Sequence, residues 1–241
     1  MAWPIQELRR FVEAALVNPV PRDHRESDAA FRRRRIVVAS TLVIGAAVLA
    51  WALRITPGDR LFYVATLALP VVWVVGAVSS GPLHLGYSTT RLGDRQSRAV
   101  VQSLVLGFIL LVTFLAGSAV VAQIPALQDP VDRLLAHASS GSLPLVAAIT
   151  AVNGIAEELY FRGALYAAIG ARHAVLSSTA VYALVTAATG IPLLVFAGVV
   201  LGTVVGLQRR VTGGILGPSI THLTWSLGML LLLPHTLELF G

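Results

Sequence analysis

The sequence predicts an all-α fold, a polytopic helical bundle embedded in a membrane, and three observations support this prediction. Hydrophobic residues make up 56% of the 241 residues and charged residues only 12%, whereas roughly a quarter of residues are charged in an average soluble domain. Several apolar runs reach the ~20 residues that a helix needs to cross a bilayer. Arginines cluster between these runs. A very apolar soluble α/β domain is the alternative, but its core would not need runs of this length.

Seven apolar segments could form the spans, because each is roughly long enough at ~1.5 Å of rise per residue. The segments cover about residues 36–53, 61–80, 99–124, 144–169, 174–190, 191–207 and 211–233. The fifth and sixth are short, and the sequence ATGIPLL joins them. That join fits either a tight turn or a re-entrant bend. Six spans plus one irregular pair is therefore the alternative to seven spans.

The N-terminal residues 1–35 are expected to form a cytoplasmic unit ahead of a transmembrane domain at 36–241. Within this unit, residues 3–18 fit an amphipathic helix with one apolar stripe that contains Ile5, Leu8, Val12 and Leu16. Such a helix would lie in the membrane interface or dock on the protein's own loops. A polar linker and the run RRRR follow, directly before the first predicted span.

The distribution of arginines predicts the orientation of the bundle. Alternate loops carry most of them: Arg32–Arg35, Arg91, Arg95, Arg98, Arg172, Arg209 and Arg210. The opposite loops carry only Arg54, Arg60 and Arg133. Since basic loops stay in the cytoplasm, we expect a multi-pass plasma-membrane protein with a cytoplasmic N-terminus and an external C-terminus. This alternation favours seven spans over six.

The remaining composition narrows the classes of function and partner. The net charge of +6 comes from arginine alone, because the chain has no lysine. In a membrane protein such a charge reports orientation and contact with lipid headgroups, so membrane lipids are expected partners and nucleic acid is not. The absence of cysteine excludes disulfides, thiolate metal sites and a cysteine nucleophile. Gly198, Gly202 and Gly206 form a small-residue ridge that predicts close approach of another helix, or else reflect general glycine richness.

The fourth predicted span carries the sequence IAEELYFRGAL, residues 155–165, with three charges in an apolar stretch. One charge at the centre of a spanning helix costs about 2.5–3.5 kcal/mol. Glu158 and Arg162 are four residues apart, so they share a helix face and can form an ion pair. Glu157 is rotated by about 100° and has no evident partner. It must face a polar cavity or stay protonated. A structural ion pair and a proton relay are the alternatives to an active site.

His222 is the one histidine well inside a predicted span, at a depth similar to that of Glu157. Pro218 precedes it by four residues and can open the helix there. A membrane-embedded histidine level with a pair of glutamates is typical of an active site rather than of a packed core. The sequence therefore predicts one polar site built from Glu157, Glu158, Arg162 and His222.

The string EELYFRG, residues 157–163, resembles the EExxxR motif of the CPBP intramembrane protease family, which includes the Rce1-type CAAX endopeptidases and the Abi proteins. The motif HxxxN or HxxxD of that family matches His222 to Ser226. The resemblance covers about residues 144–233. It implies an intramembrane endopeptidase that hydrolyses a peptide bond in a membrane-associated peptide or protein tail.

The resemblance also implies a role for each site residue. Glu157 would be the general base that activates water, and Glu158 with Arg162 would be the supporting pair. His222 would polarise the scissile carbonyl. Alternatively, Glu157 and His222 would bind a zinc ion, whose bound water becomes acidic.

Two residues depart from the family's pattern. The middle motif, FxxxH, aligns with Tyr182 to Thr186, so threonine replaces its histidine, and Ser226 replaces asparagine or aspartate. Thr186 and Ser226 are expected to support the site, although a threonine is a poor zinc ligand. The alternative is a pseudoprotease that binds a partner without cleaving it. A proton-coupled carrier is a third hypothesis, but the chain lacks the internal repeat typical of transporters.

Overall fold

The computed structural model describes residues 2–52, 55, 60–89, 96–139 and 142–240. Helical elements account for nearly all of the described secondary structure. They are α1 (Ala2–Val12), η1 (Glu13–Val17), α2 (Asp28–Ala52), α3 (Arg60–Ser80), α4 (Val100–Val121), α5 (Pro125–Ser139), α6 (Leu143–Glu157), η2 (Glu158–Leu165), α7 (Tyr166–Ile169), α8 (Ala174–Ala187), α9 (Pro192–Thr212) and α10 (Leu216–Phe240). In addition, β1 (Ser88–Thr89) pairs antiparallel with β2 (Gln96–Ser97). The predicted all-α class is confirmed.

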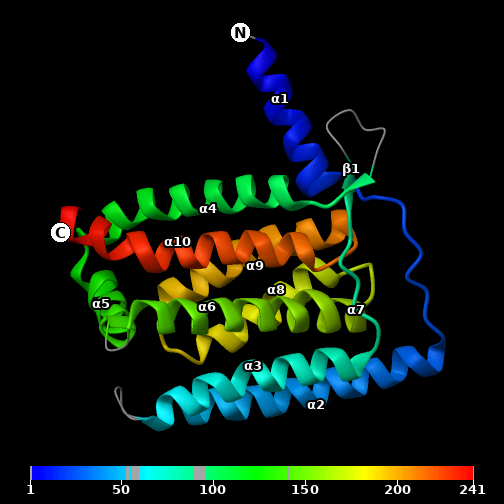
Figure 1. Cartoon of the computed structure of the whole chain (residues 1–241), viewed down its shortest axis with the longest axis horizontal. Coiled ribbons are helices and arrows are strands. Elements are labelled where there is room, and N and C mark those ends of the chain that lie inside the picture. Colours follow the sequence, from blue (N-terminus) through cyan, green and yellow to red (C-terminus); the bar gives the residue numbers. More distant parts are fainter. Residues whose placement is uncertain (1, 53–54, 56–59, 90–95, 140–141, 241) are drawn as a thin grey trace.

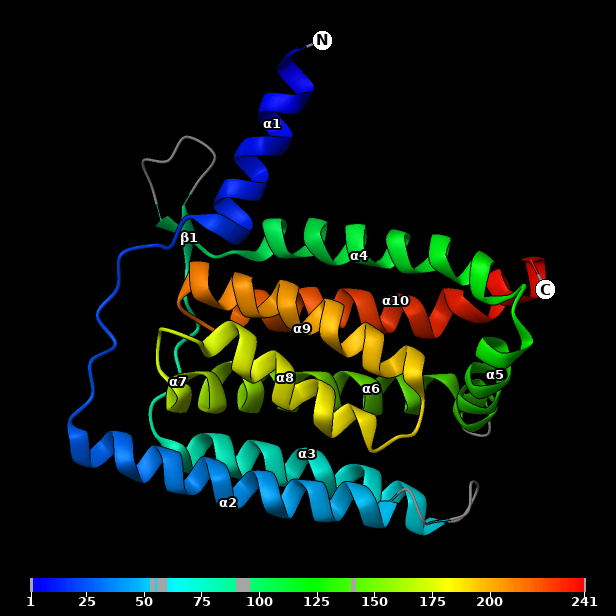
Figure 2. The same ribbon diagram turned by 180° about the vertical axis from the view of Figure 1, so that it is seen from behind.

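The long helices lie side by side in layers (Figure 1). The pair α2 and α3 forms one outer layer, and α3 packs on α6 and η2. Next to α6 lies α10, which in turn carries α4 on its other side. The pair α8 and α9 covers one face of this stack, as seen from behind in Figure 2, and α9 also contacts α10. The segment of residues 143–169 therefore lies in the middle of the bundle.

Each of the seven predicted spans contains a helix, and among the described residues four helices are long and apolar enough to cross a membrane: α2, α4, α9 and α10. Shorter apolar helices cover Val64–Ser80 and Ala174–Ala187. The helical membrane bundle is confirmed, while the count of seven spans stays a prediction. The sequence missed α5, and it placed the first helix too late. Helix α2 begins at Asp28 and continues through the arginine run, so the expected domain boundary at residue 36 falls inside it.

The join between the fifth and sixth predicted spans is a tight turn. Helix α8 ends at Ala187 and α9 begins at Pro192. Gly190 adopts a left-handed φ of 70°, which a glycine adopts without steric cost. Pro192 stands in the first turn of α9, where its missing N–H is not needed. Turn chemistry therefore accounts for the ATGIPLL sequence, and whether the helix pair crosses the membrane or re-enters it stays a prediction.

The basic loops gather at one end of the bundle, where the N-terminal helix also lies (Figures 1 and 2). Four backbone hydrogen bonds between described residues join them: Val20 to Val211 at 2.9 Å, Tyr87 to Thr212 at 3.0 Å, Ile215 to His84 at 2.9 Å and Leu216 to Leu85 at 3.1 Å. Arg91 and Arg95 lie outside the described residues. The alternating arginines predicted that these loops lie at the same end of the bundle, as they do. The orientation of that end in the membrane stays a prediction.

The N-terminal helix projects from the body of the bundle (Figure 1). Its extent, α1 followed by η1, matches the predicted helix at 3–18 within a residue. Only the η1 end packs on the bundle, where Ala15 is buried and Arg210 donates to the Leu16 carbonyl oxygen at 3.2 Å. On α1, Ile5 is 70% exposed and Leu8 is 60% exposed. The alternative of a helix docked along its length is therefore not observed, and interfacial placement remains the prediction for α1.

The glycine ridge of α9 faces α8, as the small-residue pattern predicts. A methyl group on Gly202 would lie 3.1 Å from Thr179 Cγ2 and 3.2 Å from Arg162 Nη2. One on Gly206 would lie 3.2 Å from Val175 Cγ1. Such distances are tighter than ordinary contacts, so the glycines allow α8 and the Arg162 guanidinium to approach the α9 backbone.

A cluster of buried aromatic rings fills the space between α3, η2 and α8. The rings of Trp73 and Tyr160 are 4.4 Å apart, and those of Phe161 and Tyr182 are 4.9 Å apart. Tyr160 also donates to the Val38 carbonyl oxygen of α2 at 2.7 Å. Trp73 fits only because α2 has a glycine opposite it: a Cβ on Gly45 would lie 2.2 Å from Trp73 Cη2.

We expect Gly45→Ala to destabilise the bundle by about 1–3 kcal/mol, because an added methyl group must displace the Trp73 ring. The matched control is Gly117→Ala in α4, where a methyl group would have no neighbour within 4 Å. The control should be neutral or stabilising, since alanine favours helix. Unfolding midpoints of the two purified variants in the same detergent measure the effect. Equal midpoints would contradict the packing described for Trp73.

Candidate active site

The charged residues of the fourth predicted span lie where the α-helix changes to a π-helix. After α6 the backbone continues as η2, residues 158–165, in which every residue except Leu159 is buried. Such π-helical segments are rare and frequently mark functional sites, because their widened turn re-aims side chains. No sequence signal predicted this change of backbone.

Three charged or polar side chains meet in the centre of the bundle. Glu158 Oε1 lies 3.2 Å from Arg162 Nη1 and 2.8 Å from His222 Nδ1. The side chains of Glu158 and Arg162 are 0% exposed and that of His222 is 6% exposed. The predicted pairing of Glu158 with Arg162 is therefore present, and His222 of α10 joins it. Attraction among these groups offsets part of the cost of removing them from water.

The contact with Glu158 fixes the role of each His222 nitrogen. Since a carboxylate accepts hydrogen bonds, we assign a proton to Nδ1, which then donates a hydrogen bond to Glu158 Oε1 at 2.8 Å. This assignment leaves Nε2 as the nitrogen that can act on a bound molecule. Gly154 lies beside that edge of the ring, because a Cβ there would be 3.8 Å from Nε2. Histidine nitrogens oriented by a carboxylate in this way are typical of catalytic and metal-binding histidines.

Glu157 is in a different environment from its neighbour. It is only partly buried, and the Tyr182 hydroxyl of α8 donates a hydrogen bond to its Oε2 at 2.7 Å. Among the described residues, this hydroxyl is its one hydrogen-bond partner. The Arg162 guanidinium also stands over the Tyr182 ring, with Cζ 4.5 Å from the ring centroid, a favourable cation–π geometry. Tyr182 therefore contacts both halves of the site.

Sequence reasoning missed the Tyr182 hydroxyl. It matched this position only to the phenylalanine of the family's middle motif. The available signal was chemical: a tyrosine in place of phenylalanine adds one donor to a buried ring, and such donors usually find an acceptor. The nearest unpaired acceptor on the neighbouring helix was Glu157.

The structure does not bring Thr186 and Ser226 to the carboxylates. Thr186 donates back to the Tyr182 carbonyl oxygen of its own helix at 2.9 Å, so its hydroxyl does not reach toward Glu157. Ser226 Oγ is buried and has no hydrogen-bond partner among the described residues. A supporting role for either residue stays a prediction that these contacts do not favour.

A large apolar cavity lies beside the site. Its volume is about 820 Å³, and α4, α5, α6, α9 and α10 contribute to its lining, which includes Phe114, Ile149, Phe196, Trp225, Ser226 and Met229. Small-molecule pockets typically measure ~300–1,000 Å³. Of the predicted site residues, Ser226 alone lines it, but the rings of His222 and Trp225 are only 6.3 Å apart. Trp225 therefore both lines the cavity and lies next to the histidine.

The residues present do not fit a zinc site. Catalytic zinc is held by three protein ligands, and no group of three His, Cys, Asp or Glu side chains converges within the described part of the chain. Glu158 Oε1 is already shared by Arg162 and His222. This leaves Glu157 and His222 Nε2 as the available donors, which is the pair that the sequence suggested and one ligand too few.

The helical membrane bundle thus holds one buried glutamate, one partly buried glutamate, an arginine and a histidine close together. In the family comparison, residues 139–228 match the family model described as Type II CAAX prenyl endopeptidase Rce1-like. The predicted family resemblance is therefore confirmed over this segment of the chain. Comparisons with curated proteins and with solved structures found no match.

We expect Arg162→Gln to destabilise the protein by about 3–5 kcal/mol, because it leaves the buried Glu158 carboxylate without its cation. The double variant Glu158→Gln with Arg162→Gln should cost less than the sum of the two single variants. Arg172→Gln is the control, since Arg172 is exposed. Chemical unfolding of the four variants in one detergent gives the coupling energy. Additive effects would show that Glu158 and Arg162 do not depend on each other.

Proposed function

We propose that this protein is an intramembrane endopeptidase in which Glu157 activates the attacking water. One observation carries the proposal: the two adjacent glutamates have different environments. Glu158 is fully buried and bound to both Arg162 and His222. Glu157 is partly buried, and its Oε1 accepts no hydrogen bond from the described residues. A general base needs an oxygen that is free to reach a water molecule.

The geometry supports a complete hydrolysis. Glu157 takes a proton from water, and the water oxygen bonds to the scissile carbonyl carbon. The C=O bond opens to an oxyanion, which His222 stabilises by donating from Nε2 in its doubly protonated form. Glu158 orients the ring through its contact with Nδ1, as the carboxylate of a hydrolase triad orients its histidine. The C–N bond then breaks, and Glu157 passes its proton to the departing amine.

Tyr182 positions the base in this scheme. Its hydroxyl holds Glu157 Oε2, which leaves Oε1 for the water, and its ring is held by the Arg162 guanidinium. This arrangement supports activity despite Thr186, because the base is oriented by a group other than the family's middle histidine. The apolar cavity beside His222 suits an apolar segment of the substrate, so we infer a membrane-associated peptide or protein tail as substrate class.

The second candidate function is a pseudoprotease that binds such a segment without cleaving it. The contacts of Thr186 and the unpartnered Ser226 hydroxyl favour it, because neither residue supplies what the family's pattern has there. Loss of one member of a catalytic set can lower a rate by orders of magnitude.

Comparison of membrane-associated peptides in three strains distinguishes the two functions. The strains are a deletion, the deletion complemented with the wild-type chain, and the deletion complemented with Glu157→Gln at equal expression. We expect fragments that appear only with the wild type, because glutamine cannot accept the proton of water. Identical peptide profiles in all three strains would favour the pseudoprotease.

In the same assay Tyr182→Phe should lower the yield of those fragments by about tenfold to a hundredfold, the order that misplacement of a catalytic group costs. The ring and its contact with Arg162 are retained, so the fold should persist. Thr186→Ala is the matched control on the same helix, and it should leave the yield unchanged because its hydroxyl bonds only to the helix backbone. The opposite order of effects would transfer the positioning role from Tyr182 to Thr186.

A further inference from the structure

A second polar cleft lies at the basic end of the bundle, away from the glutamates. Its volume is about 290 Å³, and its lining includes Arg22, His24, Glu26, Arg34, His84 and Arg209. The cleft is formed by the linker before α2, the first turns of α2 including Asp28, the segment after α3, Gly163 of η2, and the ends of α7 and α9. These parts are the basic loops that the sequence predicts to face the cytoplasm, so the cleft opens at the expected membrane surface.

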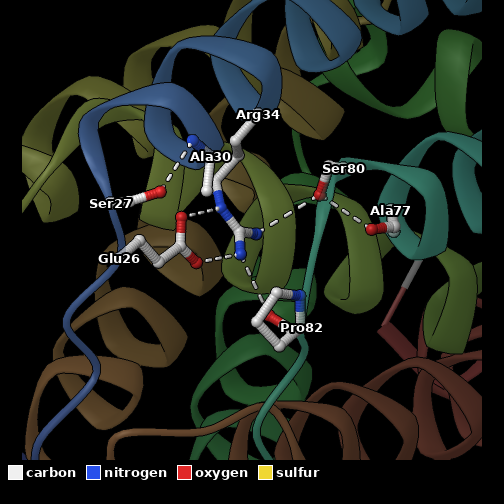
Figure 3. Close-up of polar contacts among 7 residues, drawn as sticks. All are labelled: Glu26, Ser27, Ala30, Arg34, Ala77, Ser80 and Pro82. Carbon is white, nitrogen blue, oxygen red and sulfur yellow. Dashed lines mark hydrogen bonds and ion pairs between the residues drawn. The ribbon is translucent and has the colours of Figure 1, made fainter.

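The positive charge of Arg34, on one wall of the cleft, is already neutralised by the Glu26 carboxylate. Arg34 donates from Nε to Glu26 Oε2 at 3.0 Å and from Nη2 to Glu26 Oε1 (Figure 3). It also donates to Ser80 Oγ at 3.3 Å and to the Pro82 carbonyl oxygen at 3.2 Å. Arg34 is 1% exposed. This arginine is therefore saturated with acceptors and serves to fix the linker against the end of α3.

The other two arginines are not neutralised. Arg209 is 5% exposed and donates from Nε to the Arg162 carbonyl oxygen at 2.7 Å. Arg22 donates from Nη1 to the Val211 carbonyl oxygen at 3.3 Å. Among the described residues, no carboxylate lies within ion-pair distance of either guanidinium. Arg209 is therefore a buried cation without an anion, which is costly, and an anionic ligand would lower that cost, whereas Arg22 is exposed at the rim.

Two histidines line the cleft between these arginines. The rings of His24 and His84 stack with centroids 3.7 Å apart and planes at 7°. Burial, followed by the neighbouring His84 and Arg209, lowers the pKa of His24 from its ordinary 6.5 to about 4. Burial, followed by Arg209, also lowers the pKa of His84. Both rings are therefore neutral near pH 7, and each offers one N–H donor.

We propose that this cleft binds a phosphate-type oxyanion. Guanidinium groups present forked donors that match phosphate oxygens, and Arg22 and Arg209 have donors without an anionic partner. The shared chemistry fits two sources, the headgroup of an anionic lipid or free phosphate, and basic clusters at the cytoplasmic surface attract such headgroups. The proposal does not depend on proteolysis.

The cleft is connected to the glutamate site through Arg209. That side chain lines the cleft and also holds the carbonyl oxygen of Arg162, the residue that pairs with Glu158. A ligand that orders Arg209 would thus also order the C-terminal half of η2. Binding of an anionic lipid in the cleft would therefore act on the active centre through Arg209 and Arg162.

The test uses the purified full-length chain in nanodiscs of neutral phosphatidylcholine, titrated with inorganic phosphate by calorimetry at constant ionic strength. A second arm uses native mass spectrometry in detergent with phosphatidylglycerol and with phosphatidylcholine. We expect Arg22→Gln to weaken binding of the oxyanion by about tenfold, the value of one charge-assisted hydrogen bond. Arg25→Gln is the matched control, because Arg25 is three residues away and its side chain is 93% exposed.

Each outcome decides the proposal. Saturable binding of phosphate that Arg22→Gln weakens and Arg25→Gln does not would support it with a free anion as the ligand. Selective retention of phosphatidylglycerol with the same dependence would support it with a lipid as the ligand. Absence of both, or equal loss in the two variants, would overturn it. His24→Phe keeps a ring for the stack but removes its donor, so it carries the same test if Arg22→Gln does not fold.

Discussion

The shared contact of Glu158 with Arg162 and His222 is the interaction on which the rest of the structure depends. It joins η2 to α10 at a point where Glu158 and Arg162 are 0% exposed and His222 is 6% exposed. Arg162 extends the connection, because its guanidinium covers the Tyr182 ring of α8 and lies against Gly202 of α9. Four helical elements are thereby fixed around one carboxylate. Removing one charge would leave the others buried and uncompensated.

Because Glu158 is held by Arg162 and His222, the two adjacent glutamates have different roles. Glu158 has Oε1 shared by a cation and an imidazole, and its Oε2 is buried without a partner. Such a group can orient its neighbours but cannot reach a substrate. Glu157, one residue earlier, ends α6 before the backbone widens into η2, and its hydrogen-bond partner among the described residues is the Tyr182 hydroxyl. A change of helix type between two neighbouring residues thus gives them different chemistry.

The sequence predicted the features that depend on composition and local spacing. Apolar runs predicted the helices, the four-residue spacing of Glu158 and Arg162 predicted their pair, and the glycines of α9 predicted its close packing on α8. The sequence could not predict η2, because π-helical hydrogen bonding is decided by tertiary packing rather than by local propensity. Tyr182 was missed for a similar reason: its hydroxyl gains a role only when α8 is placed against α6. The early start of α2 depends on Arg34, whose burial is compensated by Glu26 from the linker.

The most direct test of this division of work is labelling of the purified protein with a hydrophobic carbodiimide, followed by peptide mass spectrometry. Such a reagent modifies carboxyl groups that it can reach within an apolar environment. We expect modification of Glu157 and none of Glu158, with the label lost in Glu157→Gln. Equal labelling of both glutamates, or labelling of Glu158 alone, would contradict the assignment of Glu157 as the reactive carboxylate.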